Sequence, residues 1–367
     1  MLKDRPGLLF ISMTDQANGA ENVWLMAAVA SRSPIIFLKK TGYGSLNIPS
    51  GQRAIYLSDK SILLGALKLI FVLRSFRGVI AMSTHSYLNA FLGFLKCIHL
   101  FKGTVVVREC ACIFSRYSGF KKWLYKTAYL IGYKGVSMVV CQTYEMRTDF
   151  LRNIHLLQNS RVIVQNNPVD LKKINYLANS QVNDPDFLNQ PFICAAGRLI
   201  PEKGFDILIQ AFSFIEQQYP HLKLFIFGDG PEKQALNKLI ISYKLQKKII
   251  LKGWIANPLP FFKNARVCVV SSVKEGFPNV LLQMMALNSC VTSTLCAGGI
   301  ENIHGILKAQ VNNANSLACQ LKLALSDDYY KNPSLTASYF KDRTPDKFVR
   351  SILDRLTEVS KSVSPIE

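Results

Sequence analysis

An acidic residue and a tight turn stand between an apolar strand and an apolar helix in the string SSVKEGFPNVLLQMMAL, residues 271–287. The preceding ARVCVVSS is short, β-branched and uninterrupted, which predicts a buried strand, and VLLQMMAL has helical spacing that begins just after Pro278. Unpaired N–H groups at the start of that helix favour an anion, as does the positive end of the helix dipole. Glu275 beside them can accept hydrogen bonds from hydroxyl groups. The segment therefore predicts a site for a phosphorylated sugar.

The same segment resembles the signature of the retaining GT-B glycosyltransferases of family 4 (glycosyl transferases group 1), two glutamates separated by seven residues. Glu275 matches the first glutamate, and Gln283 stands in place of the second. The resemblance implies that Gln283 holds the ribose of a nucleotide, without the charge-assisted strength of a carboxylate. It implies donor contacts from the turn as well: Gly276, Phe277, Pro278 and Asn279. The alternative is a plain strand–turn–helix of an α/β sheet.

A second string, AAGRLIPEKGFDILIQAF at residues 195–212, predicts a strand, a basic loop and a helix. Arg198 and Lys203 are close enough in this loop to face one ligand. The resemblance assigns them to the departing diphosphate, whose charge they stabilise as the glycosidic bond breaks, with Gly197 beside the donor. Taken alone, an arginine and a lysine in a loop are more often solvated surface cations. Their spacing, together with the downstream motif, favours the site.

Two glycine-rich turns extend the resemblance in this half of the chain. LKLFIFGDGPEKQAL, from residue 222, predicts a further strand, turn and helix, but it lacks the GxGxxG spacing of a dinucleotide fingerprint, so no NAD site is predicted. CAGGIENI, from residue 296, resembles the family's glycine-rich loop, shortened here. In it the backbone amides of Gly298 and Gly299 approach phosphate or hexose, and Glu301 is a weaker acidic candidate than Glu275.

The amino-terminal half supplies its own candidates. DQANGAENVW resembles the family's Gly-Gly-Ala-Glu loop with an asparagine in place of the first glycine, and Gly19 lets the backbone lie close to the donor. His85 follows an apolar strand, which places it on the rim where doubly wound sheets bind ligands. The resemblance implies that it reaches the donor sugar, whereas a lone histidine without partners is more often structural. Arg108 and Glu109 end another strand and are acceptor candidates, unless they pair with each other.

Strands and helices alternate along the whole chain, which predicts parallel sheets with helices on both faces. Seven short apolar runs lie between residues 7 and 165, and the polar string NSQVNDPDFLNQP separates them from the later ones. The resemblance implies an α/β GT-B fold of two Rossmann-like doubly wound domains facing across a cleft. The predicted domains are 1–180 for the acceptor and 181–345 for the nucleotide sugar, with a helix at 346–367 that crosses back to the first domain.

Charge is unevenly distributed over the 367 residues, whose net charge is +20. Residues 1–170 hold 21 Lys and Arg against 8 Asp and Glu, or +13, and the remainder holds 23 against 16, or +7. Cations alternate with aromatic and aliphatic residues at 61–78 and 120–135, a pattern typical of a helix on an anionic membrane surface. The alternative is a pair of core helices whose lysines extend to solvent. No apolar run is long enough to span a bilayer, and no signal peptide is recognisable, so we expect a cytoplasmic protein, peripheral on the inner face of the cytoplasmic membrane.

The resemblance implies a retaining hexosyltransferase that moves a hexose or N-acetylhexosamine from a nucleotide diphosphate sugar, with UDP weakly favoured. The acceptor is a sugar hydroxyl of a lipid-linked oligosaccharide or surface polysaccharide, of O-antigen, capsule or lipopolysaccharide type. No cofactor and no metal are expected, since cations and a helix terminus face the diphosphate, and the 9 cysteines lack metal-site spacing. One alternative is a catalytically degenerate binding subunit of a polysaccharide assembly. Nucleic acid is not an expected partner, because the basic half lacks a recognised binding motif.

Overall fold

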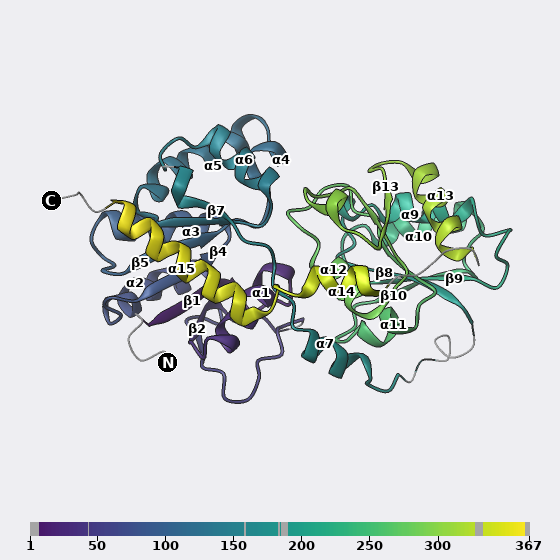
Figure 1. Cartoon of the computed structure of the whole chain (residues 1–367), viewed down its shortest axis with the longest axis horizontal. Helices are drawn as coiled ribbons and strands as arrows, with labels where there is room; N and C mark the ends of the chain where they lie inside the picture. The colour runs from purple at the N-terminus through teal and green to yellow at the C-terminus, as the bar shows by residue number, and fades with distance from the viewer. Residues whose placement is uncertain are drawn as a thin grey trace. The chain divides into compact units, whose positions relative to one another are not determined.

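The computed structural model describes residues 7–42, 44–157, 159–182, 184, 190–326 and 333–363. The chain divides into two compact units, Met1–Pro168 with Arg343–Glu367, and Val169–Asp342. Each unit has its own parallel sheet with helices on both faces, so the predicted α/β fold with two doubly wound sheets is confirmed (Figure 1).

The boundary between the units lies after Pro168 and not near residue 180. The reason is helix α7 (Leu171–Ala178), which packs on two helices of the second unit. Its residues Ile174 and Ala178 are buried in that unit's core. The polar segment that follows α7 therefore lies within the second unit. At the other end, the chain returns to the first unit at Arg343, close to the predicted start of the last helix at 346.

The first unit contains a seven-stranded parallel sheet with the order β3-β2-β1-β4-β5-β6-β7. Strand β1 pairs with β2 on one side and with β4 on the other, and the strand order reverses between β1 and β4. Each of the seven apolar runs predicted from the sequence forms one of these strands. They are β1 (Leu8–Thr14), β2 (Ile35–Lys39), β3 (Ala54–Tyr56), β4 (Ile80–Thr84), β5 (Thr104–Arg108), β6 (Met138–Cys141) and β7 (Val162–Val164).

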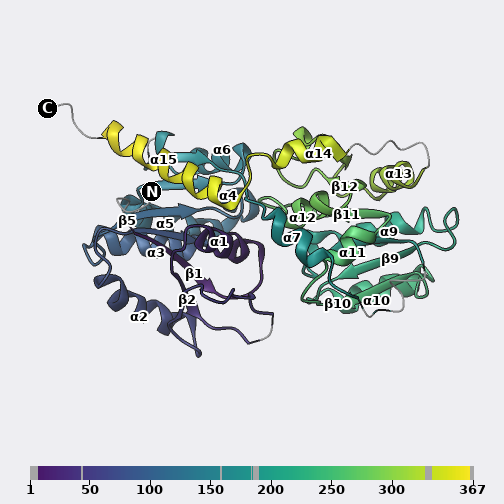
Figure 2. The same ribbon diagram turned by 60° about the horizontal axis from the view of Figure 1, so that its bottom comes forward.

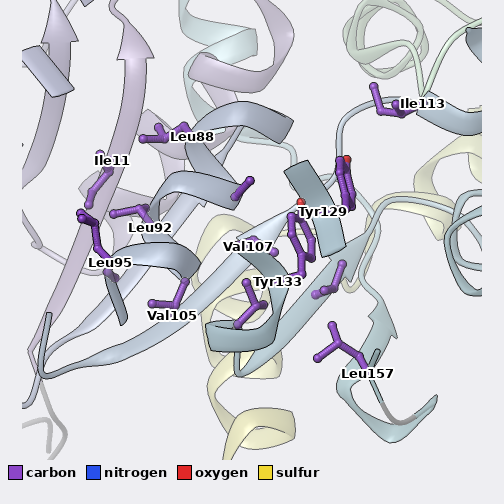
Figure 3. Close-up of a cluster of buried hydrophobic side chains, with 14 of the residues drawn as sticks. Ile11, Leu88, Leu92, Leu95, Val105, Val107, Ile113, Tyr129, Tyr133 and Leu157 are labelled. Carbon is purple, nitrogen blue, oxygen red and sulfur yellow. The ribbon is translucent and has the colours of Figure 1, made fainter. Parts of the chain in front are cut away.

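Helices cover both faces of this sheet (Figures 1 and 2). On one face α2, α3, α5 and α6 cover a buried cluster that includes Leu69, Leu92 and Tyr129, the last two of which are labelled in Figure 3. On the other face α1 and α15 meet through Trp24 and Phe348, whose rings lie 6.4 Å apart. The helices are α1 (Gly19–Ala30), α2 (Ile62–Arg74), α3 (Ser86–Cys97), α4 (Ile113–Arg116), α5 (Gly119–Gly132), α6 (Tyr144–Asn153) and α15 (Pro345–Val363), with short 3-10 turns η1 (Tyr133–Gly135) and η2 (Asn159–Arg161).

The second unit contains a six-stranded parallel sheet with the order β10-β9-β8-β11-β12-β13. Its strands are β8 (Phe192–Ala196), β9 (Lys223–Phe227), β10 (Ile249–Gly253), β11 (Val267–Val270), β12 (Val291–Thr294) and β13 (Leu307–Ala309). The remaining helices of the unit are α9 (Phe205–Ser213), α10 (Lys233–Ser242), α11 (Leu259–Asn264), α12 (Asn279–Leu287), α13 (Ala314–Leu325) and α14 (Pro333–Phe340), with 3-10 turns η3 (Pro201–Lys203) and η4 (Ile300–Asn302).

Candidate functional site

The strand order of the second unit reverses between β8 and β11, which are hydrogen-bonded neighbours. In open α/β sheets, ligands bind at such a reversal, beyond the carboxyl ends of the strands. The loop after β8 carries Arg198 and Lys203, and the loop after β11 carries Glu275. The fold thus brings together the two motifs that the sequence analysis singled out, although 72 positions separate Lys203 from Glu275.

An ion pair joins these two loops. Lys203 Nζ lies 2.7 Å from Glu275 Oε1, and the two side chains are only 18% and 16% exposed. The same carboxylate oxygen accepts a hydrogen bond from the Ser272 hydroxyl at 2.5 Å, and the Glu275 N–H donates to the Cys296 carbonyl at 2.8 Å. Two donors, the Lys203 ammonium and the Ser272 hydroxyl, therefore hold one carboxylate oxygen, and the backbone hydrogen bond to Cys296 fixes the residue that carries it. A lysine ammonium has three donor hydrogens, so Lys203 keeps donors for a ligand while it holds Glu275.

Close backbone contacts fix the loops that carry the pair. Gly204 has a φ of 58°, and a Cβ at this position would lie 2.3 Å from the Ser271 carbonyl oxygen. The Ser271 hydroxyl in turn donates to the Lys203 carbonyl at 2.9 Å. Gly228 approaches Gly197 even more closely, since its Cβ would lie 1.8 Å from the Gly197 oxygen. Only glycine fits both contacts, so these glycines position Gly197 and Lys203 at the strand ends.

Arg198 is exposed and its guanidinium has no hydrogen bond or ion pair to any residue that the structure describes. Its neighbour Leu199 is fully buried and anchors the loop to the core. An unpaired guanidinium with five fixed donors beside an anchored loop suits a diphosphate, which accepts two parallel hydrogen bonds from it.

The turn before α12 presents the start of that helix to the same edge of the sheet. Phe277 is buried in the unit's core, and Pro278 occupies the cap position with no side-chain hydrogen bond to the first turn. Gly276, Asn279 and Gln283 are partly exposed, and the last two are one helical turn apart on one face. The Gln283 side chain therefore lies on the same face of α12 as Asn279, the first residue of that helix. Its contact with a ribose stays a prediction.

The glycine-rich loop after β12 has a different arrangement from the one expected. The N–H of Gly299, with φ at 91°, donates to the Glu301 carboxylate at 2.9 Å. The Glu301 carboxylate therefore accepts a hydrogen bond within its own turn, so the Gly299 N–H already has a hydrogen-bond partner. Gly298 lies beside them in the same exposed turn. Direct donor contacts from Gly298 and Gly299 stay predictions.

The first unit has a matching strand reversal between β1 and β4, and His85 lies there at the end of β4. Its backbone has a φ of 79°, uncommon for a residue other than glycine. Its Nδ1 lies 2.9 Å from the Thr84 carbonyl and its Nε2 lies 3.2 Å from a carboxylate oxygen of Glu21. Glu21 was missed as a site residue, although it is the glutamate of the string that contains Gly19, the first residue of α1.

Arg108 and Glu109 are both buried and form no ion pair with each other, although the Asn89 amide donates both to the Arg108 carbonyl at 3.2 Å and to the Glu109 carboxylate at 3.3 Å. The Arg108 guanidinium donates to Asn167 at 2.5 Å and lies 5.7 Å from the Trp24 ring. The Glu109 carboxylate accepts hydrogen bonds from Tyr129 at 2.6 Å and from Tyr133, whose rings are labelled in Figure 3. The exposed fractions of Arg108 and Glu109 are 0% and 2%, so a direct contact with an acceptor requires rearrangement.

Burial raises the pKa of the Glu109 carboxyl, and hydrogen bonds from the two tyrosines and from Asn89 oppose this rise. Burial likewise raises the pKa of Cys296, to about 12, with a further contribution from the nearby Glu275. The raised pKa disfavours the thiolate form of Cys296. Within the part of the chain that the structure describes, no three His, Cys, Asp or Glu residues gather in a way that fits a metal ion.

The second unit is similar to a known family of proteins. Residues 180–339, which lie wholly within it, match the family model of glycosyl transferases group 1. The chain is 33% identical over 179 residues to an uncharacterized glycosyltransferase, MJ1059, of Methanocaldococcus jannaschii, a match that covers 48% of this chain and 44% of that protein. The aligned part of the chain thus spans less than half the length of this relative.

A second relative matches a longer part of the chain. It is the N-acetylgalactosamine-N,N'-diacetylbacillosaminyl-diphospho-undecaprenol 4-alpha-N-acetylgalactosaminyltransferase of Campylobacter jejuni, which is 28% identical over 265 residues. The match covers 70% of this chain and 70% of that protein.

Among solved structures, Anabaena Alr3699/HepE with UDP-glucose superposes with a TM-score of 0.78 at 15% identity, over 96% of this chain and 99% of that one. The likeness to solved structures shows that the chain has the GT-B fold, and the family match covers residues 180–339 of it.

Proposed function

We propose that the chain is a retaining glycosyltransferase that takes a hexose or N-acetylhexosamine from a nucleotide diphosphate sugar. The observation that carries this proposal is the Lys203–Glu275 pair at the strand reversal of the second unit, with the unpaired Arg198 beside it. Membership of family 4, retention of anomeric configuration, and UDP as the nucleotide belong to the same proposal.

In the proposed reaction the diphosphate leaves from the sugar's anomeric carbon while the acceptor hydroxyl attacks the same face. Arg198, Lys203 and the N–H groups at the start of α12 stabilise the negative charge on the diphosphate, and its oxygen takes the acceptor's proton. Glu275 orients the sugar and supports positive charge on its ring. Gln283 binds the ribose through its amide. No step needs a metal ion, because these cations and the helix terminus face the diphosphate.

The acceptor is a sugar hydroxyl of a lipid-linked oligosaccharide or a surface polysaccharide of O-antigen, capsule or lipopolysaccharide type. Support comes from the Campylobacter relative, whose name specifies a diphospho-undecaprenol acceptor. A relative from Staphylococcus aureus, 28% identical over 118 residues, is named as a capsular polysaccharide biosynthesis glycosyltransferase. His85 at the reversal of the first sheet is a proposed polar contact of the sugars, with the buried Glu21 holding its ring and with Arg108 and Glu109 in the wall behind them.

A thermal-shift screen of the full chain against UDP, GDP, ADP and their sugars tests donor binding, since a ligand of the native state raises its melting temperature. We expect one nucleotide to stabilise the protein and Arg198→Ala to abolish the shift. Arg266→Ala is the matched control: Arg266 is exposed just before β11, at the opposite edge of the same sheet. If Arg266→Ala and Arg198→Ala weaken binding equally, or no nucleotide binds, the proposed donor site is wrong.

A membrane surface is a proposed partner of the first unit. Residues 60–144 contain 12 Lys and Arg and a single acid, the buried Glu109. Helices α2, α3 and α5 pack on the same face of the sheet, and each has exposed apolar side chains. The most exposed are Leu63, Leu67 and Phe71 of α2, Ile98 next to α3, and Phe120, Trp123 and Ile131 of α5. We call this layer the basic apolar face.

Large apolar patches mixed with cations and lacking acids fit an anionic bilayer, where apolar side chains enter the interface and cations meet the headgroups. Among the described helices, none is long and apolar enough to cross a membrane. The proposal is therefore peripheral association with the inner face of the cytoplasmic membrane, where a lipid-linked acceptor is held.

A further inference from the structure

A cavity of about 320 Å³ lies in the first unit, at the amino-terminal edge of its sheet. Ser137, which directly precedes β6, and Arg161, which directly precedes β7, line it together with the carboxyl-terminal half of α15. His85, Arg108 and the proposed acceptor contacts lie at the opposite, carboxyl-terminal edge. The cavity is thus separate from the site described above.

The charge of the lining has one sign. Lys96, Lys134 and Arg161 line the cavity, and its lining contains no acidic residue. Three cations around one cavity repel one another, and neither Lys134 nor Arg161 has a side-chain hydrogen bond or ion pair to the residues that the structure describes. A bound anion is attracted by the three cations and reduces the repulsion between them.

Among the three cations, Arg161 gives the strongest evidence for a bound anion. Its side chain is only partly exposed, and its Nε is a buried donor without a hydrogen-bond partner in the described part of the chain. A buried, unsatisfied donor of a charged group costs free energy, which a ligand oxygen at this place would recover. Lys96 is differently placed, because its Nζ already donates to the Gly103 carbonyl at 2.6 Å.

The remaining lining is apolar and hydroxylic. Val136, Leu356 and Val359 form its apolar part, and Ser137 adds a hydroxyl. A volume of this size admits a small polar group with a short carbon chain attached, but not a nucleotide sugar. An anion with three or more acceptor oxygens matches two guanidinium donors and two ammonium groups better than a carboxylate does.

From this geometry we propose that the cavity binds a phosphate ester, held by Arg161 and Lys134 with Lys96 and Ser137 behind them. The phosphate ester has two possible sources, because two of the cationic residues lie close to the basic apolar face. Lys134 lies in η1, just beyond α5 and three positions after the exposed Ile131, and Lys96 lies in the last turn of α3, two positions before the exposed Ile98. A headgroup phosphate of a bilayer on that face is one source, and a small soluble phosphate ester is the other.

The test uses the full chain with Arg161→Gln and Lys134→Gln combined. The matched control is Arg53→Gln, because Arg53 is exposed before β3, at the same edge but the other end of the sheet. One arm measures co-sedimentation with vesicles of phosphatidylcholine, with and without phosphatidylglycerol. The other arm titrates sn-glycerol 3-phosphate calorimetrically, in an Arg198→Ala background so that the donor site does not compete.

We expect the double variant to lose about fivefold in affinity per cation, or about 25-fold in total, in at least one arm. Loss with anionic vesicles alone identifies a lipid headgroup, and loss with glycerol phosphate identifies a soluble ester. An unchanged melting temperature of the ligand-free variants shows that they are folded. If the double variant and Arg53→Gln behave alike in both arms, the cavity is no phosphate site and the proposal is overturned.

Discussion

At the scale of single residues, the Lys203–Glu275 pair links stability to function. Replacing Glu275 by glutamine leaves the Lys203 ammonium largely buried without its counter-charge, so we expect the free energy of unfolding to fall by about 2 kcal/mol. Chemical denaturation of Glu275→Gln and of Lys203→Met measures this. The double variant Lys203→Met, Glu275→Gln removes both charges, and we expect it to lose less than the sum of the single changes. Strict additivity would show that the two groups do not interact in solution.

Glu109 gives a prediction about pH. Its carboxyl has a higher pKa in the folded chain than the ordinary 4.5, so the folded state binds the proton more tightly than the unfolded state does. Its contribution to stability is therefore complete below about pH 4.5 and is lost as the pH rises through the folded-state pKa. Each unit of pKa shift corresponds to about 1.4 kcal/mol.

Glu109→Gln removes this titration, so we expect its free energy of unfolding to fall less steeply between pH 5 and pH 8 than that of the unchanged protein. Denaturant unfolding at several pH values measures the slope. Glu145→Gln, at an exposed position in the same unit, is the control and keeps the original slope. A steeper fall in Glu109→Gln would mean that the buried carboxylate is favourably ionised and that the assigned direction is wrong.

At the scale of elements, the contact between the β8 and β11 loops depends on Gly204. Alanine there adds about 1–2 kcal/mol for a left-handed backbone, and its Cβ meets the Ser271 carbonyl oxygen at 2.3 Å. Gly253→Ala is a matched control with φ at 73° and no atom within 4 Å of the added Cβ. We expect Gly204→Ala to be the more destabilising and also to weaken nucleotide binding, because Lys203 shifts with the loop. Equal loss from both substitutions would show that the close approach is unimportant.

The strands of the first sheet and the closeness of Lys203 to Glu275 were predictable from sequence because their signals are local. Short apolar runs mark each strand of the first sheet, and the carboxyl-end rule places Lys203 near Glu275. The Arg108–Asn167 hydrogen bond was not predictable, since its partners are 59 positions apart with no periodicity to link them. The domain boundary was predicted too late in the chain because the polar string after α7 resembles a linker. The burial of Ile174 shows that α7 packs in the core of the second unit. Glu301 was not predicted to bond its own turn, since a side-chain cap depends on loop geometry.

At the scale of the whole molecule, the basic apolar face predicts membrane binding that depends on both charge and apolar contact. Phe120→Ala with Trp123→Ala should weaken binding to vesicles containing phosphatidylglycerol at least tenfold, because two exposed aromatic side chains lose their burial in the interface. Vesicle co-sedimentation at two salt concentrations measures this. Tyr176→Ala, an equally exposed aromatic of the second unit, is the control. Equal binding by all three proteins would contradict the proposed face.

The central claim is that the second unit's site transfers sugar and does not merely bind it. The most direct measurement is release of nucleoside diphosphate from the donor that binds best, in the presence of a lipid extract from the source organism. The unchanged protein, Glu275→Gln and the exposed-site control Lys238→Ala are compared. We predict release by the first and third, and a loss of about a hundredfold in Glu275→Gln while the donor still binds. Donor binding without release by the unchanged protein would contradict this account and favour a binding subunit.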